Sequence, residues 1–205
     1  MNKIKNPKNE YFIALIFIVL TVIFWGYSFI STKIVLKEVP PVSIAFFRQI
    51  IASVTLVIWL FLSRTSFKFS FKDTWIIALS GLFGIVLYFV FENTALKYTT
   101  ASNASMIVAA VPIFTLITEM LFFKLKITPR IILCILLSIA GVYFVITENG
   151  KLDFSSSTFF GNILMIGAMI AWVVYTILNK NLSEKYSSIL ITAYQSIISI
   201  FLFIP

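Results

Sequence analysis

Seven long runs of apolar residues follow one another along the chain, and polar or charged segments separate them. A helix of about 20 apolar residues spans the roughly 30 Å hydrocarbon core of a bilayer. Hydrocarbon favours helices because each backbone polar group then finds its partner within its own segment. The pattern therefore predicts an all-α, polytopic membrane protein with seven spans, at residues 12–30, 42–62, 74–91, 99–123, 130–147, 159–178 and 188–205.

Composition supports a membrane protein. The chain is 60% hydrophobic and 12% charged, and it contains 22 Phe residues among 205. Its mean hydropathy of +1.02 lies far above that of a soluble globular domain. We therefore expect the lipid bilayer to be its environment and exclude a soluble domain.

The chemistry available to the chain is limited by two residue types. Cys134 is the single cysteine, so no intramolecular disulfide can form, and histidine is absent from the sequence. Catalysis by Ser-His or Cys-His pairs and metal sites built on imidazole therefore lack a required part. We expect no enzymatic activity, no cofactor and no metal, while a membrane enzyme that uses Glu, Asp or Lys as its base remains a distant alternative.

The basic residues alternate between the segments that separate the apolar runs. Eleven of the 16 lie before the first span or after the second, fourth and sixth, at Lys3, Lys5, Lys8, Arg64, Lys68, Lys72, Lys124, Lys126, Arg130, Lys180 and Lys185. Four lie in the opposite set, at Lys33, Lys37, Lys97 and Lys151. Cytoplasmic segments carry the excess of Lys and Arg, so we expect a cytoplasmic N-terminus in a multi-pass protein of the cell (inner) membrane. The net charge of +8 is then a topological signal and does not indicate nucleic-acid binding.

An internal repeat is suggested when the chain is compared with itself at an offset of 147 residues. Trp25 then falls on Trp172 and Lys33 on Lys180, each pair near the end of a corresponding span. The polar linker at 151–157 divides five spans from two, so we predict one repeat at residues 1–150 and part of a second at 151–205. Because five is odd, the second copy is inverted, which is typical of secondary transporters. On this period three further helices are expected to complete the second copy.

Several stretches resemble the EamA-type drug/metabolite transporters. They are FWGYSFISTKIVL at 24–36, YFVFENTALKYTTASNASMI at 88–107, VPIFTLI at 111–117 and SIAGVYFVI at 138–146. The resemblance implies two five-helix repeats and secondary transport of small molecules. The chain departs from the family pattern at Leu125 and Cys134, where the family usually carries Glu and Gly.

Polar and aromatic residues within the spans are the candidates for a substrate pathway. An ionisable residue at membrane depth costs about 2.5 to 3.5 kcal/mol on insertion scales and is a functional candidate by default. The candidates are Trp25, Ser28, Arg48, Glu92, Asn93, Ser102, Asn103, Trp172, Tyr175 and Gln195.

Each candidate also has a structural alternative. Arg48 either faces a cavity or extends to the lipid headgroups, and Glu92 either binds a proton or cation or pairs with Lys97. The small polar residues also suit helix packing. Pro112 lacks an N–H and is expected to kink the fourth span.

The sequence therefore predicts a secondary transporter that works by alternating access. We expect export of a small metabolite, an amino-acid-like compound or a drug, driven by an ion or substrate gradient because no nucleotide-binding loop is present. The alternative is a truncated, non-transporting membrane subunit or relic. In either case a homodimer or the missing C-terminal helices would complete the cavity.

Overall fold

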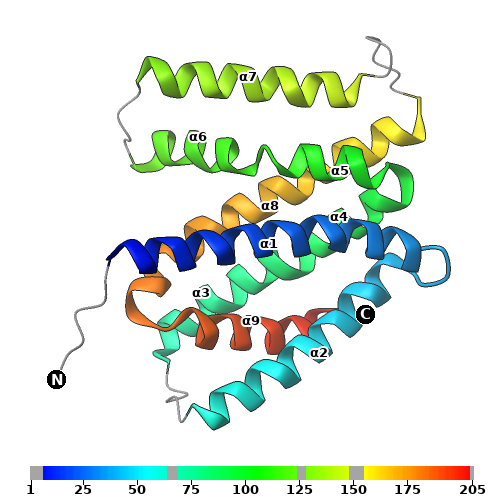
Figure 1. Cartoon of the computed structure of the whole chain (residues 1–205). Helices are drawn as coiled ribbons and strands as arrows, with labels where there is room; N and C mark the ends of the chain where they lie inside the picture. The colour runs from blue at the N-terminus through cyan, green and yellow to red at the C-terminus, as the bar shows by residue number, and fades with distance from the viewer. Residues whose placement is uncertain (1–6, 64–68, 124–127, 148–154, 204–205) are drawn as a thin grey trace.

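The computed structural model describes residues 7–63, 69–123, 128–147 and 155–203, and these residues form helices without any strand (Figure 1). In chain order they are α1 (Pro7–Val35), α2 (Pro41–Leu62), α3 (Phe71–Gly81), a π-helical segment (Leu82–Leu87), α4 (Tyr88–Tyr98), α5 (Ala101–Val108), α6 (Val111–Phe123), α7 (Pro129–Ile146), α8 (Ser157–Lys185) and α9 (Ser188–Leu202). Several residues used above for topology or boundaries lie outside the described part: Lys3, Lys5, Arg64, Lys68, Lys124, Leu125, Lys126, Lys151 and Pro205.

The seven predicted spans correspond to helical segments of the structure. Five are long and apolar enough to cross a membrane, at Tyr11–Val35, Pro41–Leu62, Phe71–Tyr98, Ala101–Met120 and Ser157–Lys185. Two more, Pro129–Val145 and Ser188–Leu202, are apolar but shorter. The prediction of an all-α polytopic membrane protein is confirmed.

Two of the spans are not regular α-helices throughout. The third contains the π-helical segment between α3 and α4, and wider turns of this kind often occur at functional sites. The fourth is interrupted at Ala109 and Ala110, directly before Pro112. A proline ring clashes with the carbonyl four residues earlier, which here belongs to Val108, the last residue of α5. The predicted kink at Pro112 is therefore present as a break between α5 and α6.

Most helix starts are set by local sequence. Side-chain oxygens accept the backbone N–H three residues ahead at the starts of α3, α5, α7, α8 and α9, from Ser70, Thr100, Thr128, Ser156 and Ser187. Such caps satisfy N–H groups that have no partner within the helix. Proline stands in the first turn of α2 and α7, where its missing N–H costs nothing.

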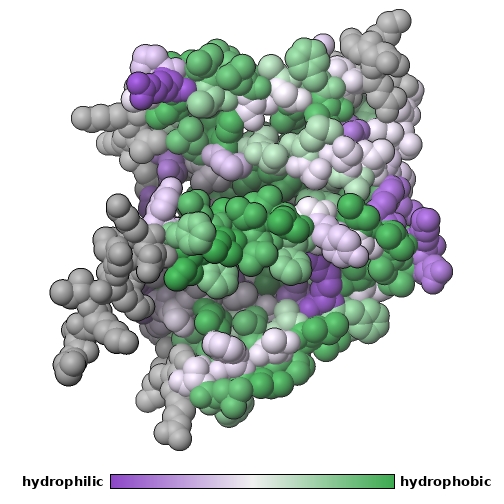
Figure 2. All heavy atoms as spheres, viewed as in Figure 1, coloured by the Kyte–Doolittle hydropathy of each residue, from purple (hydrophilic) through white to green (hydrophobic). Residues whose placement is uncertain are grey.

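The bundle has a packed centre and a loosely covered periphery. The helices α2, α3, α4, α8 and α9 pack against one another, whereas α6 and α7 lie at one edge (Figure 1). Within an apolar stretch of 18 residues, only 6% of the residues of α1 are buried, compared with 39% of those of α8. The face that carries α1 is largely hydrophobic, with hydrophilic atoms concentrated toward the helix ends (Figure 2). A lipid-facing role for this surface explains why so many large apolar side chains are exposed.

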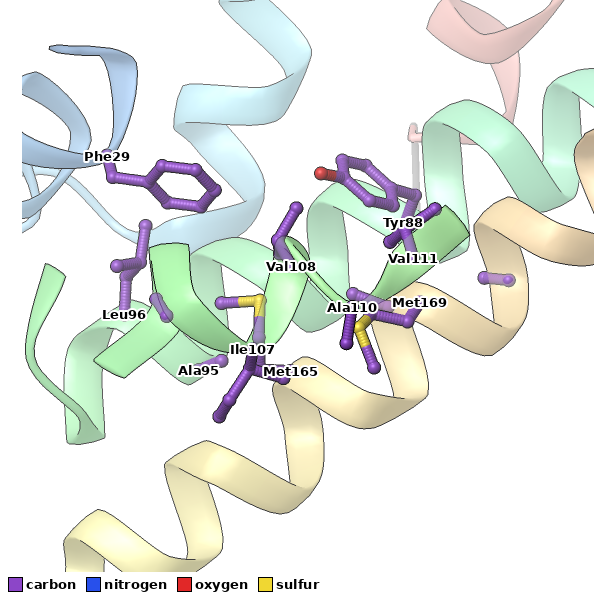
Figure 3. Close-up of a cluster of buried hydrophobic side chains, with 13 residues drawn as sticks. Phe29, Tyr88, Ala95, Leu96, Ile107, Val108, Ala110, Val111, Met165 and Met169 are labelled. Atoms are coloured by element: carbon purple, nitrogen blue, oxygen red, sulfur yellow. The ribbon is translucent and has the colours of Figure 1, made fainter. Parts of the chain in front are cut away.

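A buried apolar cluster joins α1, α4, α5, α6 and α8. Figure 3 shows Met165 and Met169 of α8 among side chains of the other helices, including Phe29, Leu96 and Ile107. Most of the buried polar residues lie instead on α2, α3, α4, α8 and α9 or at their ends: Gln49, Ser53, Asp73, Ser80, Glu92, Asn93, Thr99, Asn162, Gln195, Ser196 and Ser199; Thr32 of α1 and Thr147 after α7 are buried as well. The polar interior therefore lies mainly among these five helices.

Candidate functional site

A polar cavity of about 310 Å³ lies among the central helices. Helices α2, α4, α8 and α9 and the π-helical segment all contribute to its wall. Its lining residues are Arg48, Gln49, Ala52, Leu56, Gly84, Ile85, Phe89, Trp172, Tyr175, Thr192, Gln195 and Ser196. We call this space the polar cavity. It includes four of the ten candidates chosen from the sequence: Arg48, Trp172, Tyr175 and Gln195.

Arg48 provides the charge of the polar cavity. Its guanidinium carbon lies 4.4 Å from the ring centroid of Phe89, a distance at which a cation and an aromatic face attract each other. Its Nη1 atom is buried and has no hydrogen-bond partner in the described part of the chain. Arg48 also lines a second space between α1 and α2, where Ser28 is a neighbour, and hydrophilic atoms are visible between these helices in Figure 2. The accessible part of the Arg48 side chain therefore contributes to the walls of both spaces.

Gln195 is held in place by its amide group. Its Nε2 atom donates to Ser80 Oγ at 2.6 Å and to Asn179 Oδ1 at 2.9 Å, so one side chain of α9 joins α3 and α8. The side chain is 1% exposed. At the offset of 147 residues used above, Arg48 falls on Gln195, and both residues line the polar cavity.

Trp172 separates the polar cavity from a second cavity that is mainly apolar. This apolar cavity has a volume of about 340 Å³ and lies beside the break between α5 and α6. Its lining residues are Val22, Trp25, Gly26, Phe29, Ser105, Val108, Ala109, Val111, Pro112 and Trp172. The indole of Trp172 also lies close to the rings of Trp25, Tyr88 and Tyr175, with centroid distances of 6.1, 5.2 and 4.9 Å. Trp172 is thus common to both cavities.

Glu92 and Asn93 are buried in α4 and do not line either cavity. Asn93 Nδ2 donates to the carbonyl of Pro41 at 2.9 Å and ties α4 to the start of α2. Glu92 is 2% exposed, and its Oε2 has no hydrogen-bond partner among the described residues. Glu92 lies close enough to Tyr88 and Arg48 to interact with them electrostatically.

The remaining candidates occupy more peripheral places. Ser28 Oγ donates to the carbonyl of Trp25 at 2.6 Å, within α1. Ser102 and Asn103 lie in the first turn of α5, where Thr100 Oγ1 accepts the N–H of Asn103. Neither Ser102 nor Asn103 belongs to the lining of the two cavities.

Gly84 contributes to the site without having been predicted. A Cβ atom at this position would lie 2.1 Å from Cδ2 of Tyr175, so only glycine lets the aromatic ring rest on the π-helical segment. Ser80 and Gly84, two small residues four positions apart in an apolar run, are the sequence signal for such close helix packing.

A buried acidic group fixes one end of the bundle and was also missed. Asp73 at the start of α3 pairs with Lys185, Nζ to Oδ1 at 3.1 Å, and accepts the hydroxyl of Tyr186, Oη to Oδ2 at 2.8 Å. Ser70 Oγ accepts the N–H of Asp73 at 3.2 Å. These four residues, the Asp73 cluster, connect α3 to the corner between α8 and α9.

The opposite end of the bundle is joined largely through backbone atoms. Lys33 Nζ donates to the carbonyl of Thr99 at 2.7 Å and also to that of Leu96, which satisfies carbonyls at the end of α4. Thr99 Oγ1 donates to Asn162 Oδ1 at 2.6 Å. At Gly161 a Cβ atom would lie 2.7 Å from the backbone nitrogen of Thr99, so α4 and α8 are in direct backbone contact. We call Lys33, Thr99, Gly161 and Asn162 the Thr99 cluster.

Comparison with known proteins identifies relatives over most of the chain. The model of the EamA-like transporter family matches residues 12–147. An uncharacterized transporter of Archaeoglobus fulgidus is 35% identical over 200 residues, which is 98% of this chain and 67% of the relative. A second from the same organism is 30% identical and covers 87% of this chain and 61% of the relative. The uncharacterized transporter YetK of Bacillus subtilis is 26% identical, over 88% of this chain and 55% of the relative.

The chain thus spans between 55% and 67% of the length of these relatives. One crystal structure shares the fold, with a TM-score of 0.55 and 16% identity over 90% of this chain and 69% of that chain.

Proposed function

Because the chain belongs to the EamA-like transporter family, we propose that it takes part in secondary transport of a small metabolite through the polar cavity. The observation that carries the proposal is Arg48, an ionisable side chain within a membrane span that lies in the wall of that cavity. Burying such a group in a membrane is costly, so it is a functional candidate by default. The solute is a small metabolite, an amino-acid-like compound or a drug, and the direction is export.

The repeat relation supports a shared pathway between two related parts of the chain, 1–150 and 151–205. At the offset of 147 residues, Trp25 and Trp172 are equivalent and lie 6.1 Å apart, while Arg48 and Gln195 are equivalent and line one cavity. Substrate sites of transporters with inverted repeats lie near the midplane, where the related helices meet.

The two ends of the bundle suggest how access to the polar cavity alternates. The Thr99 cluster holds α4 and α8 together through the close backbone approach at Gly161 and the side-chain hydrogen bond from Thr99 to Asn162, whereas the Asp73 cluster joins α3 to α8 and α9 through polar side chains. The close approach at Gly161 keeps α4 and α8 together, so the Asp73 end is the one that opens and closes. The Asp73 end follows the second span and so lies on the same side of the membrane as the N-terminus. If the N-terminus of this inner-membrane protein is cytoplasmic, the Asp73 end faces the cytoplasm.

Transport by reconstituted protein tests the proposal. The intact protein is placed in proteoliposomes that are loaded with a panel of radiolabelled amino acids, organic acids, organic cations and nucleosides, and efflux is followed. We expect efflux of at least one compound, and loss of that efflux in Arg48→Ala. Arg130→Ala, at the exposed start of α7, is the matched control and should keep normal efflux.

Two results would contradict the proposal. One is efflux at the level of empty liposomes for the whole panel by protein that remains folded and monodisperse. The other is normal efflux in Arg48→Ala, which would assign Arg48 to interaction with the lipid headgroups. The oligomeric state is measured on the same sample, because residues of a second copy could also line the cavity.

A further inference from the structure

The charges near the cavities define what kind of solute fits them. Arg48 is the charged residue in the lining of the polar cavity, and among the described residues no Asp or Glu lines either the polar or the apolar cavity. Glu92, the nearby carboxylate, is buried away from both spaces. A cationic solute would meet the guanidinium in a cavity whose wall has no carboxylate, whereas an anionic solute would be attracted by the guanidinium.

The polar cavity can bind more than a bare charge. Gln49, Thr192 and Ser196 stand with Arg48 in its wall and carry amide or hydroxyl groups that can donate hydrogen bonds to an oxygen anion. Phe89, which lies beside Arg48, and Trp172 and Tyr175 contribute aromatic rings to the same wall. A solute with an anionic group at one end and an apolar group at the other would suit both kinds of lining residue.

The apolar cavity extends the space for the second part of such a solute. It adjoins the polar cavity at Trp172, and its other walls are mostly aliphatic or aromatic. The volumes of the two cavities, about 310 and 340 Å³, each lie at the lower end of the range for small-molecule sites. A carboxylate at Arg48 therefore places its attached apolar group at the Trp172 ring, which forms the boundary between the cavities.

This inference rests on the proposed function. We propose that the site selects an amphipathic organic anion, with its carboxylate at Arg48 and an uncharged apolar group, about the size of an aromatic ring, at Trp172. Arg48 accounts for the choice of charge and Trp172 for the choice of apolar group. Neither residue alone explains both.

Four matched compounds separate these contributions. They are 3-phenylpropionate, its neutral amide, the cation 3-phenylpropylamine and the short anion propionate. Binding to the intact protein in nanodiscs is measured by calorimetry, with the thermal midpoint of each variant recorded as a check on folding. We expect 3-phenylpropionate to bind at least about tenfold more tightly than each of the other three.

Variants assign the two halves of the preference. Arg48→Gln should weaken 3-phenylpropionate by about tenfold or more and abolish its preference over the amide, while Arg48→Lys should keep the preference with lower affinity. Trp172→Leu should weaken 3-phenylpropionate but leave propionate unchanged. Arg130→Gln and Trp75→Leu, at exposed positions, are the controls and should bind normally.

The outcomes separate the choice of solute from the transport activity itself. Equal or tighter binding of the amide or the amine would overturn the anion assignment, even if efflux of another compound proves transport. Equal losses in Trp172→Leu and Trp75→Leu would overturn the place given to the apolar group. Absence of binding by all four compounds to folded protein would also reject the proposed solute, and only the efflux panel would then decide on transport.

Discussion

The two ends of the helix bundle are held together by different kinds of contact. At the Thr99 cluster, α4 and α8 approach so closely that backbone atoms meet at Gly161, and a lysine from α1 satisfies the last carbonyls of α4. At the Asp73 cluster, the helices are joined by an ion pair and a tyrosine hydroxyl. The first is a close contact between two helices. In the second the polar contacts break by rotation of side chains, and the buried apolar cluster of Ile77, Leu182 and Ile191 lies at the same end.

This difference assigns separate roles to the two halves of one span. Residues Phe71–Tyr98 form a continuous span, but the π-helical segment divides it into α3, which belongs to the Asp73 end, and α4, which belongs to the Thr99 end. The polar cavity lies against the π-helical segment at Gly84 and Ile85. A movement of α3 relative to α4 would therefore change the wall of the cavity itself.

The largest effect is expected from closing the space at Gly161. In Gly161→Ala the new methyl group would lie within 3 Å of backbone atoms of Ala95 and Thr99. Overpacking of this kind costs about 1 to 3 kcal/mol, so the free energy of unfolding in detergent should fall by that amount. Gly141→Ala is the control, because a Cβ atom there has no neighbour within 4 Å. Equal stability of the two variants would show that α4 and α8 are not in rigid contact.

The next effect is expected at the Asp73 cluster, and it should be functional more than structural. Asp73→Ala removes the acceptor of both Lys185 and Tyr186, so the Asp73 end should open more often and the polar cavity should become more accessible from it. The double variant Asp73→Lys with Lys185→Asp should restore part of the wild-type behaviour. Efflux rates and proteolysis at the α8–α9 corner report the change. A double variant no better than either single variant would exclude a direct charge pair.

A smaller effect is expected for Lys33, which caps the end of α4. Lys33→Gln should lower the free energy of unfolding by about 1 kcal/mol, because a cation near a helix C-terminus contributes roughly that much. Lys37→Gln, an exposed lysine in the turn after α1, should change stability less. Urea or thermal unfolding of the two variants in the same detergent is the measurement, and a larger loss in Lys37→Gln would contradict the capping role.

The smallest effect is expected at the ion pair between Glu119 and Lys180. The two charged atoms are 3.9 Å apart, and both side chains are more than 40% exposed. Exposed pairs of this kind contribute below about 1 kcal/mol. Glu119→Gln should therefore leave the free energy of unfolding and the efflux rate close to wild type. A loss of stability as large as that of Gly161→Ala would mean that this ion pair holds the helices together.

The helices could be predicted from the sequence because the bilayer imposes their length and composition. Hydrophobic runs gave the positions of all seven spans, and Pro112 gave the break between α5 and α6. The π-helical segment could not be predicted in the same way, since Gly84 and Tyr175 are distant in sequence and only their packing shows why glycine is needed.

Some of the residues chosen from the sequence lie together in the structure, while their role in a substrate pathway stays a prediction. At the offset of 147 residues Trp25 falls on Trp172 and Arg48 on Gln195, and each pair lines a common cavity. Asp73 was missed because its partners, Lys185 and Tyr186, are 112 and 113 residues away. At the sequence level Asp73 is an ordinary acidic residue in the first turn of a helix, where a carboxylate is favourable anyway.

Access to the polar cavity from the Asp73 end can be measured by labelling a cysteine in the cavity wall. Ala52→Cys places a small thiol in the cavity wall after the exposed Cys134 is replaced by Ser. A membrane-impermeant maleimide is then added from each side of proteoliposomes, with and without Asp73→Ala. We expect labelling at position 52 from the side of the Asp73 cluster only, and we expect it to increase several-fold with Asp73→Ala. Labelling that is absent from both sides, or unchanged by Asp73→Ala, would contradict a cavity whose access is controlled at that end.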